Sequence, residues 1–179
     1  MDIHLDTLLN FPDVTVESCT QELDNVFLRL HFLKDSADCP HCQQSSDDLH
    51  QTRSILLRDL SIFGQATYLK VPRRQFYCRK CQSHFTEVLS FMEPGRQYTR
   101  RYEDYIYQQV KCSSIQQVAR SEDLTFDRVE GIFNHQYNLK KKAHGAASNE
   151  LGLTRSANAK ATSSSLPLSA TLKLDNSLR

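Results

Sequence analysis

The sequence lacks any apolar run near the roughly 20 residues needed to cross a membrane. Its N-terminus, MDIHLDTLLNF, contains acids and no basic segment, so it does not resemble a signal peptide. No Ser/His/Asp constellation, phosphate-binding loop or H-E-x-x-H motif is present. With 39% hydrophobic and 24% charged residues, the 179-residue chain is typical of a soluble globular protein with one ordinary domain or two small ones. We expect it in the cytoplasm.

Charge alone decides nothing about partners. The formal net charge of +1 argues neither for nor against nucleic acid, because an overall balance can conceal a local patch. Eight basic residues lie between positions 70 and 101, where only Glu87 and Glu93 oppose them. Such a run is more often a solvated face than a binding site, although its position around a cysteine pair favours binding. The eight are Lys70, Arg73, Arg74, Arg79, Lys80, Arg96, Arg100 and Arg101.

Six cysteines are present, and four of them form two C-x-x-C pairs, CPHC at 39–42 and CRKC at 78–81. In a reducing compartment, paired cysteines bind metal more often than they form disulfides. Two intervening residues let a tight turn direct both thiolates at one ion, and two such turns complete the tetrahedron that zinc accepts. We therefore predict one structural Zn²⁺ held by Cys39, Cys42, Cys78 and Cys81. Four thiolates leave no open position, so this metal is expected to stabilise the fold and to do no chemistry.

Other interpretations of the cysteines stay open at this point. A thioredoxin-like redox pair is possible for either C-x-x-C, but no βαβ pattern surrounds them and two pairs are one too many. His41 or His84 could replace a thiolate, although each is more typical of a surface histidine. Cys19, in a predicted strand, and Cys112, at a predicted helix end, are interpreted as simple packing residues.

The first half of the chain has the period-two alternation of β-strands. Residues 25–33 place apolar side chains at 26, 28, 30 and 32 on one side, and the valines at 14 and 16 predict a partner strand in a hairpin. Three further extended segments are expected between the cysteine pairs, at 54–60, 66–71 and 74–77. Residues 61–64 form a turn after the first, and Pro72 interrupts the last two. These elements predict a small antiparallel, zinc-ribbon-like β region.

The pattern changes to helical spacing after residue 95. Thr99 can cap a helix to about residue 112, with apolar residues 102, 106 and 110 inward. Ser114, with Gln117 three residues later, fits a capping box for a short second helix that ends near residue 121. Thr125 can cap a third helix, with Phe126 and residues 129, 132 and 133 inward. Two helices joined by a few residues after a longer one form a helix-turn-helix pattern.

Past residue 137 the apolar periodicity disappears. A run of three lysines is followed by a stretch rich in Ala, Ser, Asn and Thr without any aromatic residue, for which we expect disorder. The sequence thus predicts an α+β protein in three parts. These are a β-rich zinc-binding domain at 1–93, a three-helix helix-turn-helix domain at 94–138 and a disordered tail at 139–179.

Four segments occur in a specific order along the chain: CPHC, SILLRDL, RRQFYCRKC followed by HFTE, and IQQVARSEDLTFDRVEGIF. The first three resemble the N-terminal zinc-binding region of the ISL-three family of insertion-sequence transposases, and the last resembles the helix-turn-helix of that family. Together they cover roughly residues 11–137. Gln43 departs from the pattern, because such knuckles often carry Gly there. The exposed face of the third helix is mixed and not basic, with Asp127, Arg128, Glu130, Asn134 and His135.

This resemblance implies an N-terminal part that binds double-stranded DNA at the terminal inverted repeats of an insertion element, ahead of a nuclease domain with an acidic triad. The chain supplies no such triad, so we expect no enzymatic activity. Read in a shifted frame with permitted synonymous codons, the tail from Leu153 can encode IDEISKRKGH, which resembles the start of that catalytic domain. The tail is interpreted as the product of a frameshift that truncates a transposase or, alternatively, as an ordinary disordered extension.

Basic residues around the second cysteine pair are expected to neutralise phosphates, while the third helix enters the major groove. The alternative is a stand-alone DNA-binding regulator, or a protein-interaction module whose zinc ribbon docks on an intact transposase or a second copy. No membrane partner is expected. The DNA-contact candidates are Arg73, Arg74, Arg79, Lys80, Arg100, Arg101 and Arg128.

Overall fold

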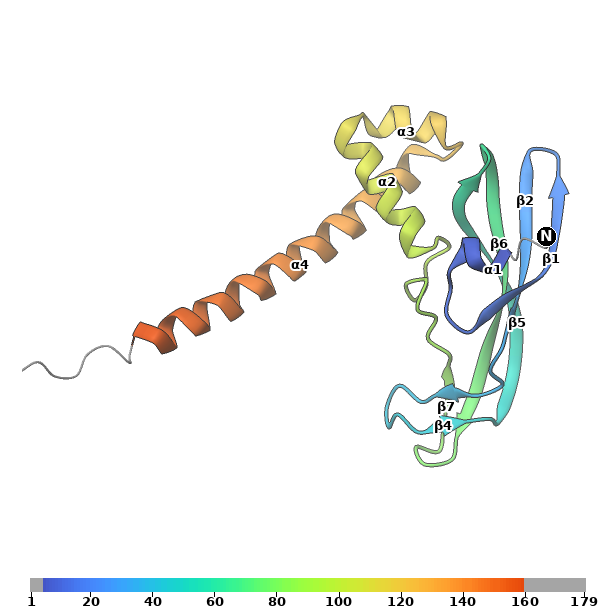
Figure 1. Ribbon diagram of the computed structural model, residues 1–179, viewed down its shortest axis with the longest axis horizontal. Coiled ribbons are helices and arrows are strands. Elements are labelled where there is room, and N and C mark those ends of the chain that lie inside the picture. Colours follow the sequence, from blue (N-terminus) through green and yellow to red (C-terminus); the bar gives the residue numbers. More distant parts are fainter. Residues whose placement is uncertain (1–4, 160–179) are drawn as a thin grey trace, which may run out of the picture. The chain divides into compact units, whose positions relative to one another are not determined.

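The computed structural model describes the chain from residue 5 to residue 159, with side chains described to residue 142 (Figure 1). Residues 1–136 form one compact unit, and a second unit begins at residue 137. The predicted zinc-binding and helix-turn-helix domains both fall almost entirely within the first unit, and their division at residue 94 stays a prediction. None of the described helices is long and apolar enough to span a membrane.

A five-stranded sheet forms most of the first unit. It contains, in spatial order, β1 (Val14–Glu22), β2 (Asn25–Phe32), β6 (Gln65–Cys78) and β5 (Leu49–Ile62), and β7 (Ser83–Thr86) pairs with the far end of β6. β1 and β2 form the predicted antiparallel hairpin. β2 and β6 are parallel, however, so the expected antiparallel arrangement is wrong for this one pair of the sheet. Parallel neighbours need a long crossover connection, and the segment from β2 to β6, which includes β5, provides it.

β5 and β6 form an antiparallel hairpin of 14 residues in each strand, longer than predicted. Phe63 and Gly64 make its two-residue loop at φ +51° and +79°. Both central positions of such a turn require the left-handed conformation, which Gly64 adopts without the steric cost of a Cβ atom. The predicted turn at 61–64 is therefore confirmed at Phe63 and Gly64, whereas Ser61 and Ile62 still belong to β5.

β6 continues through Pro72, which pairs with Ser54, so the predicted interruption at this proline is wrong. Pro72 lies between Lys70, the last β6 residue paired with β2, and Gln75, the first paired with β7. Its nitrogen faces this unpaired stretch, because the carbonyl of Arg74, two residues on, accepts from the Glu87 N–H on the same edge. The missing N–H thus removes no ladder hydrogen bond.

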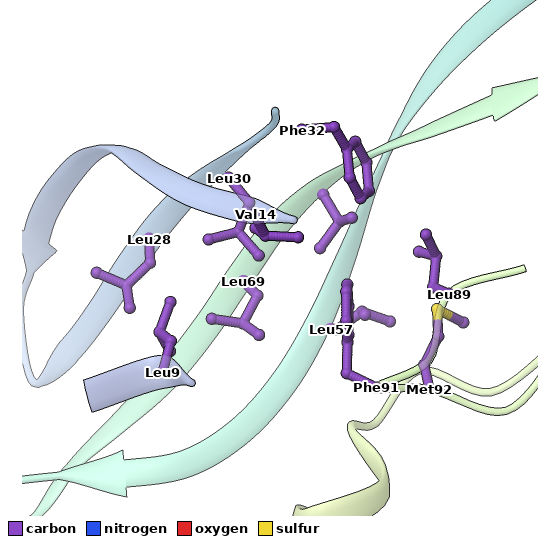
Figure 2. Close-up of a cluster of buried hydrophobic side chains, with 11 residues drawn as sticks. Leu9, Val14, Leu28, Leu30, Phe32, Leu57, Leu69, Leu89, Phe91 and Met92 are labelled. Atoms are coloured by element: carbon purple, nitrogen blue, oxygen red, sulfur yellow. The ribbon is translucent and has the colours of Figure 1, made fainter. Parts of the chain in front are cut away.

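The main hydrophobic core lies on one face of the sheet (Figure 2). The alternation predicted for β2 is confirmed, with Leu28 and Leu30 at 1% and 2% exposure. Leu57 of β5 and Leu69 of β6 pack beside them. The cover comes from Leu9 of α1 (Leu5–Leu9) and from the segment that follows β7, through Leu89, Phe91 and Met92.

The helices form a second core, and their predicted starts are confirmed. Thr99 caps α2 (Arg100–Cys112), since its hydroxyl accepts from the Tyr102 N–H, and Ser114 caps α3 (Ile115–Ser121) in the same way. Tyr102 and Ile106 of α2 are fully buried against Val118 of α3 and against α4.

α4 (Phe126–Ala159) begins where predicted, after Thr125, and buries Val129 and Ile132 completely. Phe126 is 49% exposed, so its predicted inward position is wrong; Leu124, just before the helix, packs on the core instead. α4 also continues to Ala159, where disorder was expected from residue 139. The missing apolar periodicity removes packing against a core, but alanine, lysine and leucine still favour helix, and no proline occurs between Phe126 and Pro167. Residues 160–179 of the predicted tail lie outside the described residues.

Candidate metal centre and nucleic-acid interface

The four cysteines of the two C-x-x-C pairs meet at one end of the sheet. Cys39 follows β3 (Ala37–Asp38), which pairs with β4 (Ser45–Ser46), and Cys78 ends β6. All four Sγ atoms lie within 4.8 Å of one another, with 3.9 Å between Cys39 and Cys81 and 3.6 Å between Cys42 and Cys78. A tetrahedron with Zn–S bonds of about 2.3 Å has S···S edges of about 3.8 Å. The residues present therefore fit a tetrathiolate zinc ion.

Each pair is held by a backbone turn. The Gln43 N–H donates to the Cys39 carbonyl at 2.8 Å, and the Cys81 N–H approaches the Cys78 Sγ at 3.5 Å. That N–H lowers the pKa of Cys78 to about 7, which favours the thiolate that binds metal. A side-chain hydrogen bond with Cys42 raises the pKa of Cys81 to about 12, because it favours the protonated Cys81 thiol.

The surroundings of the site exclude the alternative ligands considered above. Among the described residues, the cluster of possible metal ligands contains the four cysteines and no histidine. His41 is exposed, and the exposed His84 has its ring centroid 4.2 Å from that of His50, with the two rings tilted. Cys19 and Cys112 are both exposed, so their interpretation as packing residues is wrong. Phe76 and Phe85 pack on the buried side of the cysteines.

The residue after each pair has a left-handed backbone, with φ +58° at Gln43 and +51° at Gln82. Replacing Gln43 by Gly is expected to raise the free energy of unfolding of the zinc-loaded protein by up to about 1 kcal/mol, because Gly has no Cβ to strain there. Thermal denaturation with zinc in excess measures this change. Gln44→Gly is the matched control and should give no gain, since it only loosens the unfolded chain. Equal stabilities of the two variants would contradict the expectation.

Two of the predicted DNA-contact arginines bond within the protein. The Arg74 guanidinium donates to both Glu87 carboxylate oxygens at 2.8 and 2.7 Å and to the Lys34 carbonyl at 2.6 Å, and the residue is 8% exposed. The Arg101 guanidinium bonds both carboxylate oxygens of Asp59 and the Leu9 carbonyl. These contacts favour a structural role for both side chains.

The other five candidates have basic groups available to solvent in different degrees. Arg79 is 82% exposed, 3.7 Å from Asp48, and Lys80 beside it is exposed as well. Arg100 pairs with Glu93 at 2.9 Å and is 51% exposed. The remaining two are Arg73, half-buried on β6, and Arg128, exposed on the first turn of α4.

A buried carboxylate organises the inner side of the helix-turn-helix. Glu103 of α2 is 1% exposed and accepts from Arg96 at 2.6 Å and from Gln136 at 3.1 Å. His135 lies 2.9 Å from the same carboxylate, so it is half-buried and bonded, where the sequence places it on the exposed face of the third helix. Asp127, Arg128, Glu130 and Asn134 of that face are exposed as predicted.

β5 connects the sheet firmly to the helices. Asp59, 1% exposed, accepts from the Thr99 hydroxyl at 2.6 Å and pairs with Arg101, while the Arg58 carbonyl accepts from the Thr99 N–H at 3.0 Å. Arg58 also pairs with Glu122, the residue in the turn before α4, at 3.7 Å. The sequence signal for Asp59 was a carboxylate at an inward position of the strand ILLRDLSI, which has no place in an apolar core without a partner.

Two family models match the chain in succession. The zinc-finger of transposase IS204/IS1001/IS1096/IS1165 matches residues 35–81, and the helix-turn-helix domain of transposase family ISL3 matches residues 87–137. The transposase for insertion sequence element IS1001 of Bordetella parapertussis is 30% identical to the chain over 94 residues. That segment is 52% of this chain and 23% of that transposase. No solved structure matches the chain.

Proposed function

Since the chain belongs to transposase family ISL3 in both its zinc ribbon and its helix-turn-helix domain, we propose that it recognises the terminal inverted repeats of an insertion element. The observation that carries the proposal is the succession of the two domains. The cysteine tetrad lies within the first match and α2, α3 and the start of α4 within the second. In this proposal zinc stabilises the ribbon. The matched segment covers only 23% of the IS1001 transposase, so the proposal does not extend to the activity of a whole transposase.

In this proposal the N-terminal turns of α4 enter the major groove, because the second helix of a helix-turn-helix reads base edges with its first residues. Asp127 and Arg128 are exposed at that position, with Glu130 one turn along. Arginine forms two hydrogen bonds to guanine O6 and N7, whereas acids accept from the cytosine amino group. A mixed face of this kind suits discrimination between bases more than affinity, so most of the affinity must come from basic residues elsewhere.

A gel-shift titration tests the function. The 179-residue protein, loaded with zinc, is titrated against a duplex with the inverted repeat that flanks its gene and against a shuffled duplex. We expect tighter binding to the repeat by about 10³-fold or more, as is typical of specific recognition. Failure to bind either duplex would contradict the proposal. Co-purification with another protein in that event would support the interaction module instead.

The expected contact between DNA and the zinc knuckle, the turn from Cys78 to Cys81, gives a separate prediction. Replacing Arg79 and Lys80 together by Ala should weaken binding to both duplexes equally and lower the slope of log K against log salt concentration by about 1–2, because each phosphate contact contributes about 0.9. Arg29→Ala with Lys34→Ala is the control of equal charge change, since both side chains already pair with acids, Glu17 and Asp13. An unchanged slope in the Arg79/Lys80 variant would show that the knuckle does not contact DNA.

A further inference from the structure

We propose that Arg53 of β5 and Arg73 of β6 form a clamp for a phosphate group of the DNA backbone. The proposal rests on the DNA-binding function above. It adds a contact that lies outside both the recognition helix and the zinc knuckle, on a residue, Arg53, that the basic run at 70–101 does not include.

The two arginines are direct cross-strand partners in the β5–β6 hairpin. Residues opposite one another in an antiparallel pair point to the same face, with Cβ atoms about 4.5–5.5 Å apart. Two like charges at this separation destabilise a sheet. In the part of the chain that the structure describes, neither arginine has an acidic group within ion-pair distance. By contrast, the three other arginines of these strands, Arg29, Arg58 and Arg74, each form an ion pair with a glutamate.

A hollow of about 240 Å³ opens between the two arginines. Its other lining residues are polar or charged: Gln51, Arg74, Gln75 and Thr86. Since a water molecule has a share of about 30 Å³, the hollow has room for a phosphate group. Glu87 lines a neighbouring hollow together with Arg73, but both of its carboxylate oxygens bond Arg74.

The clamp faces the side of the sheet that holds the helix-turn-helix. Arg53 and Asp59 are six residues apart on β5 with no register shift between them, so their side chains point to the same face, and Asp59 binds Thr99 and Arg101 of α2 there. Arg53 lies five positions before Arg58, which is a distance of about 17 Å along the strand. The backbone of Arg58 bonds Gln97 and Thr99, just before α2.

That spacing fits duplex DNA. Half a helical turn is about 17 Å, since a full turn is about 34–36 Å. On the face of the duplex where a helix occupies the major groove, the neighbouring minor groove is centred about half a turn away, with a phosphate backbone on each side of it. A phosphodiester there would join the two guanidinium groups, offset their repulsion and form charge-assisted hydrogen bonds with them.

The first experiment measures salt dependence with the full zinc-loaded chain. Arg53→Gln with Arg73→Gln should weaken binding by about ten-fold at 0.15 M salt and lower the slope of log K against log salt by about 1, equally on the repeat and shuffled duplexes. The preference for the repeat stays unchanged, which loss of a base contact would not allow. Arg29→Gln with Lys34→Gln serves as the control of equal charge.

The outcomes separate this proposal from the function it rests on. If the parent protein binds the repeat duplex and the Arg53/Arg73 variant keeps its affinity and slope, the clamp is wrong and the function stands. If the parent binds neither duplex, both are wrong.

A second experiment tests the anion site without DNA. The melting temperature of the parent should rise in inorganic phosphate over chloride at equal ionic strength, whereas that of the Arg53/Arg73 variant should not. In chloride the variant should melt at the same or a higher temperature than the parent, because the like-charge pair is gone. A lower melting temperature in chloride would identify the arginines as structural and overturn the proposal. A phosphate effect without any duplex affinity would overturn its assignment to DNA.

Discussion

A Cys78→Ser variant is expected to lose its zinc ion and the folded structure of residues 35–48 and 78–86, while the helices stay folded. Apparent binding free energies of structural zinc are about 10–16 kcal/mol in zinc-finger peptides. The core beside the cysteines is small, with Ala37, Phe76 and Phe85 as its other buried members, and cannot replace that free energy. Zinc content per chain, by elemental analysis, and backbone NMR spectra measure the two effects.

The helices should persist because, among the described residues, no cysteine belongs to their core. That core forms away from the metal site, through Tyr102, Ile106, Val118, Val129 and Ile132. Within the same part of the chain, the main sheet core contains none of the four cysteines either. Cys19→Ser is the matched control, since this cysteine of β1 is exposed and remote from the tetrad. A Cys78→Ser protein that retains one tightly bound zinc ion with an unchanged spectrum would rule out Cys78 as a ligand.

An Asp59→Ala variant is expected to lose about 3 kcal/mol of unfolding free energy. Asp59 is buried, and its removal leaves the Arg101 guanidinium and the Thr99 hydroxyl without their acceptor. Breaking a buried ion pair costs about 3–5 kcal/mol, and the lower figure applies because the Arg101 side chain is 32% exposed and keeps the Leu9 carbonyl. Urea denaturation of the zinc-loaded protein, followed by circular dichroism, provides the measurement.

Glu17→Ala is the comparison for this change. Glu17 also pairs with a cation, Arg29, but both side chains are more than half exposed, so the loss should stay below about 1 kcal/mol. Asp59→Ala should in addition increase amide hydrogen exchange at the start of α2, which Thr99 caps. Equal small losses in the two variants would show that Asp59 does not hold the sheet to the helices.

The features that the sequence predicted correctly are those set by short spacings. Two residues between cysteines determine a metal-binding turn, and Thr99, Ser114 and Thr125 stand directly before the helices that they begin. The alternation from Val26 to Phe32 determined which side of β2 is buried. Each of these depends on neighbours within a few residues, so no knowledge of the tertiary fold is needed.

The features that were missed depend on partners far along the chain. Nothing local indicates that β2 lies parallel to β6, about 40 residues later. The basic run at 70–101 could not reveal that Arg101 bonds Asp59 and the carbonyl of Leu9, 92 residues before it. Arg53, outside that run, gains its significance only from the register that sets it opposite Arg73. Charge in a sequence is therefore a poor guide to which cations remain available for a ligand.

The long β5–β6 hairpin acts as a spacer of fixed length. Leu49, which pairs with Phe76 beside the cysteine tetrad, and Arg58, beside the helix-turn-helix, are nine residues apart on β5, or about 30 Å. That is close to one turn of B-DNA, so in the proposed complex the two ends would meet the same side of a duplex about nine base pairs apart. The number of residues in the hairpin would then determine the length of the DNA site. Adding a residue pair to each strand between these points would move the ends apart by about 7 Å, which is roughly two base pairs.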